Sequence, residues 1–192
     1  MKDKFGFGIP SAVVKELGHF PGQQYSVLGP RKVVPGLSTL NDFANHDFTF
    51  GEIVKINSYE EGAYIVRPID DADTDVENIA VIMRDIVGGV AYNEAIVKGP
   101  KKNVPFSLFL LNDDQYADVV VPVAELVGHV GIVVGGEVFI GKGAGTVIGA
   151  VYGEEQGALG VDTLKLEGWE FKTLPFEPSS TDAKAVVIGR KV

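Results

Sequence analysis

The stretch from Gly136 to Gly145 comes nearest to a recognised chemical motif. Counted from Gly136, the spacing to Gly141 and Lys142 matches the start of a phosphate-binding loop. The hydroxyl that would hold magnesium should come next, but the chain has Gly143 there. In a phosphate-binding loop a helix also begins at this point, but the repeated glycines here oppose helix formation. The same lack of a helix argues against a dinucleotide-binding motif. The segment is therefore predicted to be a tight turn between two strands.

Three aspartates at alternate positions, Asp71, Asp73 and Asp75, resemble the start of a calcium-binding loop. Such a loop needs a glycine next and a bidentate glutamate at its end, whereas this chain has Val76 and Ile82 at those positions. The sequence is therefore not that of an EF-hand. We expect a solvated acidic turn, with a weak surface cation site as the alternative.

Other groups that could do chemistry are scattered along the chain. The three histidines, His19, His46 and His129, are far apart and match no metal-ligand spacing. Adjacent carboxylates fall in segments that read as turns, where solvation is the ordinary explanation. A hydrolase whose carboxylates come from distant strands stays open as an alternative. The sequence otherwise predicts no enzyme, no cofactor and no metal site.

The composition is that of a folded protein with an uneven distribution of charge. Residues 1–40 hold five basic and two acidic residues, a net charge of +3, while the remainder holds 12 basic and 24 acidic residues, a net charge of −12. An acidic body opposes binding to phosphate backbones, so we expect no nucleic-acid partner. No apolar run is long enough for a membrane helix, and there is no cysteine, which fits assembly in a reducing cytoplasm.

The elements that would position any site are short strands separated by turns. The 24 glycines have no collagen-like period, so they indicate turns and bulges. The expected strands are 52–57, 63–69, 79–87, 104–111, 118–124, 129–134, 137–140, 146–152, 163–174 and 184–192. Segment 79–87 also fits a helical stripe, and Pro122 should place its own strand at a sheet edge or at a bulge. The fold class is all-β, a sandwich or open barrel.

A change of phase in the segment 163–174 predicts a β-bulge. Leu164 and Leu166 place the apolar residues on even positions, whereas Trp169 and Phe171 place them on odd positions. Because side chains alternate between the two faces of a strand, the phase can change only through an irregularity at Gly168.

The first 47 residues are predicted to be an extended N-terminal arm, followed by a β-domain over residues 48–192. The arm is rich in proline and glycine but also in apolar residues, so it must bury them on its own domain or on a neighbouring subunit. Its positive charge is opposite to that of the body, which favours a partner. The predicted partner-binding residues are Lys2, Lys4, Phe5, Phe7, Arg31 and Lys32, with the two phenylalanines as anchors.

Residues 50–192 resemble the small β-domain proteins that decorate tailed-bacteriophage capsids or anchor fibres on them. The similarity runs through Ile79 to Val87, through the glycine turns and valine-rich strands from Val127-Gly128-His129-Val130-Gly131 to Gly149, and through the closing pair of strands. That pair is Leu166-Glu167-Gly168-Trp169-Glu170-Phe171-Lys172-Thr173 with Ala185-Val186-Val187-Ile188. Residues 1–47 depart from the pattern, being longer and richer in proline. The family has no catalytic residues to carry over.

This resemblance implies a virion structural protein, made in the host cytoplasm, that binds the outer capsid surface and reinforces the shell. The expected partners are the major capsid protein or other virion subunits. The resemblance also implies a homo-oligomer, with a trimer favoured, and exposed edge strands would suit such self-association. The alternatives are a head-fibre or tail-associated protein and a carbohydrate-binding β-module for host attachment, which a concave aromatic cluster would favour.

Overall fold

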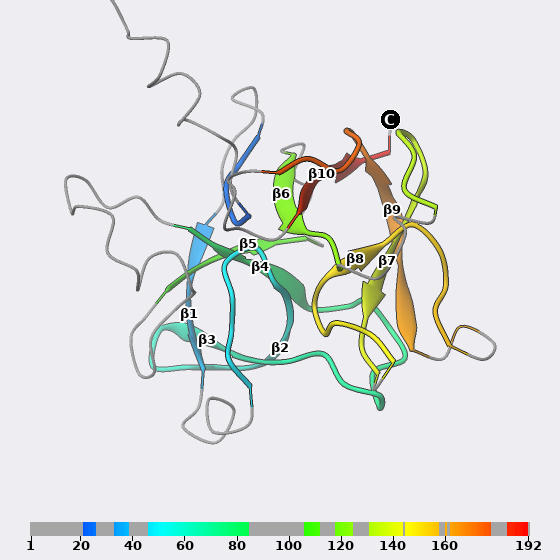
Figure 1. Cartoon of the computed structure of the whole chain (residues 1–192). Coiled ribbons are helices and arrows are strands. Elements are labelled where there is room, and N and C mark those ends of the chain that lie inside the picture. The colour runs from blue at the N-terminus through cyan, green and yellow to red at the C-terminus, as the bar shows by residue number, and fades with distance from the viewer. Residues whose placement is uncertain are drawn as a thin grey trace, which may run out of the picture.

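The protein is built almost wholly from β-strands, which form two five-stranded sheets (Figure 1). The computed structural model describes residues 21–25, 33–38, 46–84, 106–111, 118–124, 131–143, 145–157, 160, 162–177 and 184–191. Within these ranges there is no α-helix, and so none that could span a membrane. The all-β fold class predicted from the sequence is confirmed.

The first sheet is a closed barrel with the strand order β1-β3-β2-β4-β5. Its strands are β1 (Val33–Ser38), β2 (Ile53–Glu60), β3 (Ala63–Arg67), β4 (Ile79–Met83) and β5 (Phe106–Leu110). Strand β1 closes the barrel because it pairs in parallel with β3 on one side and antiparallel with β5 on the other. The other three contacts between neighbouring strands are antiparallel.

A two-residue turn joins β2 and β3 into a hairpin, at the place where the sequence predicts two successive strands over 52–57 and 63–69. Glu60 is paired with Ala63, and the two residues between them both have positive φ, 48° at Glu61 and 87° at Gly62. Positive φ at both central positions is the type I′ geometry, whose twist matches that of the strands it connects.

Strand β4 resolves the ambiguity between helix and strand in its segment. Ala80 and Ile82 belong to the cluster that fills the barrel, whereas Ile79, Val81 and Met83 belong to the core shared with the second sheet. A strand buried on both faces needs a continuous apolar run rather than an alternating one. The helix-like spacing therefore arises because every residue of β4 is buried.

The second sheet has the strand order β6-β10-β9-β7-β8. Its strands are β6 (Val119–Pro122), β7 (Glu137–Gly141), β8 (Val151–Tyr152), β9 (Thr163–Phe171) and β10 (Ala185–Arg190). Pro122 lies in an edge strand, as predicted. Both edges are covered within the described part of the chain, because Gln24 forms an antiparallel bridge with Val119, and Val123 forms a parallel bridge with Val151. The exposed edges expected to favour self-association are therefore absent from these described strands.

The glycine-rich region contains fewer strand residues than expected. The predicted strand 129–134 contains no strand over its described residues 131–134, and the predicted strand 146–152 is reduced to the two residues of β8. Positive φ at Gly131, Gly135 and Gly149 explains the difference, because an extended strand cannot contain these backbone conformations.

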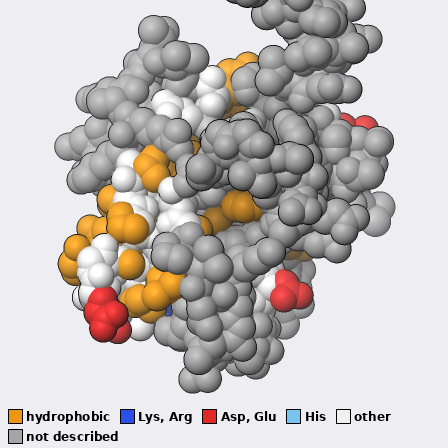
Figure 2. Space-filling view, turned by 90° about the vertical axis from the view of Figure 1, so that its left-hand side faces the viewer, with side chains coloured by type: hydrophobic (Ala, Val, Ile, Leu, Met, Phe, Trp, Pro, Cys, Tyr) orange, Lys and Arg blue, Asp and Glu red, His pale blue; other side chains and the backbone are white. Residues whose placement is uncertain are grey.

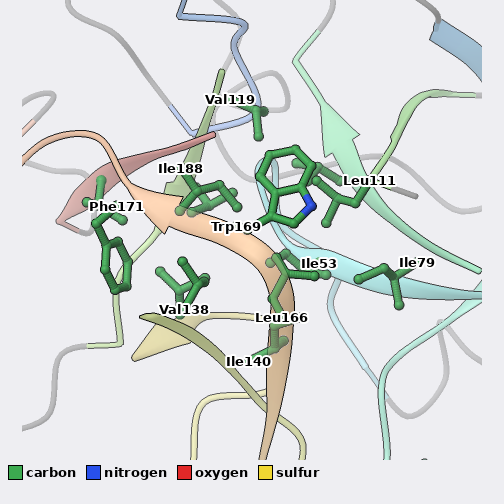
Figure 3. Packing of buried hydrophobic residues seen from close by; sticks show 14 of the residues in the cluster. Ile53, Ile79, Leu111, Val119, Val138, Ile140, Leu166, Trp169, Phe171 and Ile188 are labelled. Carbon is green, nitrogen blue, oxygen red and sulfur yellow. The ribbon is translucent and has the colours of Figure 1, made fainter. Parts of the chain in front are cut away.

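One core joins the two sheets, with Trp169 inside it (Figure 3). Leu166, Trp169 and Phe171 are all buried, while Gly168 is exposed and has φ 75°. Glu137 is opposite Glu170, but Phe139 is opposite Lys165, so two steps along β7 correspond to five along β9. The structure thus confirms a bulge that returns Trp169 to the core.

The structure differs from the expected division of the chain in the N-terminal arm. Strand β1 lies before residue 47, yet it is a wall of the barrel, and Pro21–Tyr25 lies along β6. A boundary after residue 47 therefore does not separate an arm from a complete β-domain. The sequence signal was misleading because Pro35 and Gly36 lower strand propensity, while β1 gains its hydrogen bonds from distant strands.

We predict that Gly168→Val destabilises the protein by about 1–3 kcal/mol, because valine is strained at positive φ. The fluorescence of Trp169, the only tryptophan, should change with it. Chemical denaturation and emission spectra measure both effects.

The matched control is Gly62→Val, since Gly62 also has positive φ but has no atom within 4 Å of an added Cβ. This variant should lose stability without any change in the folded-state tryptophan spectrum. Gly153 would be a poor control, because a Cβ there would collide with the backbone of Gly131 and Ile132. Unchanged stability and an unchanged spectrum in Gly168→Val would contradict the bulge argument.

Candidate functional site

The buried charged residues of the described structure gather where its parts meet. We call this zone the junction: it is the contact of the barrel with the second sheet and with the segment Pro21–Tyr25. The buried charged residues are Glu52, Asp73, Arg84 and Lys142. Burying a charge is costly unless it is paired or hydrogen-bonded, so the partners of these four residues define what the junction can do.

The first charged group of the junction is an ion pair between Arg67, the last residue of β3, and Asp73. Arg67 Nη1 donates to Asp73 Oδ2 at 2.8 Å, and Nη2 donates to Oδ1 at 2.6 Å. The backbone N–H of Asp70 donates to the same carboxylate at 2.9 Å. Burial raises the pKa of Asp73, but these hydrogen bonds and the charges of Arg67 and Lys55 outweigh burial and lower it overall.

Lys142 connects the second sheet to the loop between β3 and β4, which contains Asp73. It follows β7, and its Nζ donates to the backbone oxygen of Asp73 at 2.7 Å. The lysine that resembled the start of a phosphate loop is therefore used inside the chain. The next residue, Gly143, lies against two carboxylates, because a Cβ there would be 2.7 Å from Asp71 Oδ1 and 2.5 Å from Asp162 Oδ1. Two carboxylates beside the loop would repel an anion.

The acidic loop differs from the solvated turn that was expected. Asp73 is only 6% exposed and forms the ion pair described above, so for this residue the expectation was wrong. Asp75 is exposed and pairs with Lys55 at 2.7 Å, a hydrogen bond that lowers the pKa of Asp75. Among the described residues, no three histidine, aspartate or glutamate side chains are grouped as they would need to be to hold a metal ion.

A second buried carboxylate, Glu52, lies just before β2. Thr49 donates to its Oε2 through the backbone N–H at 2.8 Å, and His46 Nε2 lies 2.5 Å from its Oε1. The hydrogen bond to Glu52 raises the pKa of His46; burial opposes this effect, and the charges of Glu52 and Asp47 reinforce it. His46 also packs edge-on against Phe48, with 5.0 Å between ring centroids.

Glu52 also marks a contact between the barrel and the second sheet. The N–H of Ile53 donates to the oxygen of Gly149 at 2.9 Å, and a side chain at Gly149 would collide with Glu52 Cγ. Gly149, which lies just before β8, therefore allows the backbone of the second sheet to lie directly on that of the barrel. This contact fixes the position of Glu52 against the second sheet. The hydroxyl of Thr49 also lies beside the His46–Glu52 pair, because Thr49 Oγ1 donates to Glu52 Oε2 at 3.3 Å.

The fourth charged residue, Arg84, follows β4 and contacts the N-terminal segment. Its backbone N–H donates to the oxygen of Gly22 at 2.8 Å, and its guanidinium lies 5.4 Å from the ring centroid of Phe50. On the other side, the N–H of Gly22 donates to the oxygen of Val120 in β6 at 2.8 Å. Gly22 thus bridges the barrel and the second sheet through its own backbone.

The described surface presents several large hydrophobic side chains. Tyr59 is 63% exposed and Leu174 is 60% exposed. Val133 and Val134, which are adjacent in the sequence, are 57% and 61% exposed. Figure 2 looks onto the side of the barrel that carries β1 and β3, and it shows hydrophobic side chains there beside acidic ones. The predicted partner-binding residues, Lys2, Lys4, Phe5, Phe7, Arg31 and Lys32, lie outside the described residues.

Sequence reasoning missed the role of the junction residues for an identifiable reason. A carboxylate in an acidic loop is predicted to be solvated unless its partner is known. The partner of Asp73 is Arg67, at the end of β3. Lys142 is 69 residues away from Asp73. One usable signal was present, since Lys142 stands between apolar strand residues and glycines where a solvated lysine has no obvious place.

Comparisons with known proteins leave the family open: no family model matches this chain, and no curated protein matches it. The class of protein must therefore be argued from the junction and the surface.

We predict that Asp73→Asn lowers the free energy of unfolding at pH 7 by about 2 kcal/mol, because it removes a charged hydrogen-bond partner of Arg67. The control Asp75→Asn breaks an exposed pair and should cost clearly less stability than Asp73→Asn. Urea denaturation measures both. Since the pKa of Asp73 is lowered by folding, the wild-type advantage is full above the unfolded pKa of about 3.9 and is lost as the pH falls through the folded pKa. Equal losses for the two variants would contradict a special role for Asp73.

We predict that His46 makes stability depend on pH in the opposite direction. The pKa of His46 is raised by folding. Its contribution to the free energy of unfolding is therefore fully present below the unfolded pKa of about 6.5 and is lost as the pH rises through the folded pKa. Thermal midpoints between about pH 5.5 and 8.5 should fall more steeply for the wild type than for His46→Gln. The control His129→Gln should keep the wild-type slope; a His46→Gln variant that also keeps it would refute the assignment.

Proposed function

We propose that this protein is a virion structural protein that binds the outer surface of a capsid and reinforces or decorates the shell. The observation that carries the proposal is the use of its buried charges. All four contact groups of the same chain: Lys142 Nζ joins the second sheet to the backbone of Asp73, Asp73 and Glu52 have partners within the barrel, and the guanidinium of Arg84 lies over the ring of Phe50. This use of charge favours a rigid binding unit over a catalytic one.

The exposed hydrophobic side chains support binding to another protein. Single exposed apolar residues are ordinary, but the adjacent Val133 and Val134 occupy one turn, and Tyr59 carries a large ring into solvent. Tyrosine is enriched at protein interfaces, because its ring contributes area at a low cost in side-chain entropy. The resemblance of residues 50–192 to capsid decoration proteins points to a capsid as the partner.

A carbohydrate-binding module for host attachment is the second candidate, and one observation favours it. The rings of Tyr59 and Tyr64 are 5.0 Å apart at an interplanar angle of 62°, next to the exposed hairpin turn. Sugar-binding sites use such rings, but a single pair of tyrosines equally suits a protein contact. The absence of a larger aromatic series among the described residues ranks this function below capsid binding.

The arm hypothesis cannot be tested by removing the whole predicted arm. A chain that starts near Asn41 would lack β1 and the segment Pro21–Tyr25. The barrel would then be open between β3 and β5. Such a chain would lose binding for the trivial reason that it does not fold, so the deletion must end before residue 21.

We predict that deleting residues 1–10, which removes Lys2, Lys4, Phe5 and Phe7, leaves a folded protein that binds shells at least about tenfold more weakly, as expected when interface anchors are lost. The double change Arg31→Glu and Lys32→Glu should act in the same direction. Co-sedimentation with capsids lacking this protein measures binding, and Trp169 fluorescence verifies folding.

The control for this experiment is Lys191→Glu, which changes an exposed basic residue far along the chain from the arm. It should bind as the wild type does. A folded deletion variant that still saturates the capsids would remove the arm from the binding surface. Absence of binding by the wild-type chain itself would overturn the capsid proposal.

A further inference from the structure

The carboxylate of Glu52 receives its hydrogen bonds from one short segment of the described chain. Thr49 donates to Oε2 through its backbone N–H at 2.8 Å and through its hydroxyl at 3.3 Å, while His46 Nε2 lies 2.5 Å from Oε1. The Glu52 side chain is 3% exposed and the His46 side chain is 22% exposed. Of these two partners, His46 alone can change its charge, and its partial exposure allows it to exchange protons with water.

The other side of Glu52 faces the second sheet. A Cβ on Gly149 would collide with Glu52 Cγ, so the two residues are in close contact. Beside this contact, the N–H of Ile53 donates to the oxygen of Gly149 at 2.9 Å. Gly149 therefore covers Glu52 from the second sheet.

Of the two sides, the one that carries His46 and Thr49 is the more firmly fixed. Phe48 is buried among the residues that fill the barrel, and the N–H of Gly51 donates to the oxygen of Ile82 at 2.8 Å. On the other side, a single backbone hydrogen bond joins Ile53 to Gly149 within the described residues. Water would therefore reach the carboxylate of Glu52 most easily through a separation at Gly149.

We propose that His46, Glu52 and Gly149 form a pH-sensitive latch between the barrel and the second sheet. When His46 is protonated, its positive charge balances the buried carboxylate of Glu52 and the latch is closed. When His46 is neutral, its N–H still donates, but the carboxylate has no positive group in contact with it among the described residues. Hydration of the buried charge then becomes more favourable, and the contact at Gly149 opens locally while both sheets stay folded.

The charges around His46 set the direction of this dependence on pH. The hydrogen bond to Glu52 raises the pKa of His46, burial lowers it, and the charges of Glu52 and Asp47 raise it further. Strand β4, which holds this part of the barrel, has no charged side chain. Residues 146–152, which include Gly149, have one titratable side chain, Tyr152; burial raises its pKa, so it stays uncharged at neutral pH. The latch therefore opens as the pH rises above about 6.5 and through the folded pKa of His46.

Amide hydrogen exchange at Ile53 tests the proposal in the full-length chain, because the N–H of Ile53 is freed when the latch opens. The NMR signals of the His46 ring give the folded pKa in the same sample. After correction for the intrinsic exchange rate, the opening constant of Ile53 should rise through this pKa by about tenfold for each unit by which folding raises it. The N–H of Gly22, which donates to the oxygen of Val120 at another contact of the junction, is the control and should show no such rise.

Two variants separate the latch from a general loss of stability. His46→Gln cannot take up a proton at this position, so the opening constant of Ile53 should become independent of pH, whereas Thr49→Val removes an uncharged donor and should keep the dependence. Should His46→Gln fail to fold, Asp47→Asn gives the answer. Asp47 is exposed and its charge raises the pKa of His46, so this variant should shift the transition at Ile53 to lower pH.

Two results would overturn the proposal. One is an opening constant of Ile53 in the wild type that does not change through the pKa of His46. The other is exchange of Ile53 only at the rate of global unfolding, which would show that the contact at Gly149 does not open by itself. The inference does not rest on capsid binding, since it concerns the purified chain alone.

Discussion

Strand β4 must be buried on both faces, and the rest of the structure depends on this constraint. Its even residues fill the barrel and its odd residues form the core with the second sheet, so no residue of β4 reaches water. Fully burying an aliphatic side chain contributes roughly 1.5–3 kcal/mol. One face requires β1 to close the barrel, because otherwise Ala80 and Ile82 would lie in an open trough. The other face requires the second sheet to cover Val81 and Met83, and Trp169 with its neighbours does so (Figure 3).

Hydrophobic burial alone does not fix how the second sheet lies on the barrel, because it is not directional. The charged contacts of the junction supply direction. Lys142 reaches the backbone of the loop that Arg67 holds through Asp73, and Gly149 lies against Glu52 on the other side. A buried ammonium group is costly when it has no hydrogen-bond acceptor, so a misaligned second sheet would leave Lys142 without its acceptor on Asp73. We infer that Lys142 sets the alignment of the two parts more than it raises the total stability.

The sequence was sufficient wherever the determining interactions are local. The hairpin of β2 and β3, the edge position of Pro122 and the bulge at Gly168 all follow from alternation and turn residues within about ten positions. It was insufficient where a distant partner decides. Strand β1 contains Pro35 and Gly36 and becomes a strand only because β3 and β5 pair with it. Asp73 is buried because Arg67 and Lys142 come to it. The stretch 131–134 has strand-forming valines, but positive φ at its glycines turns the chain instead.

The covered edges of the second sheet restrict how this protein can associate with others. In the described structure, β6 is bridged by Gln24 and β8 is bridged by Val123, and the barrel has no edge because it is closed. A neighbouring protein therefore cannot extend either sheet by simple edge pairing. Association through the described surface therefore depends on side chains that project from it, such as Tyr59 or Val133 and Val134, in addition to the contacts proposed for the N-terminal residues. Because Gly22 bridges β6 and the end of β4 through its backbone, the N-terminal region also completes the junction.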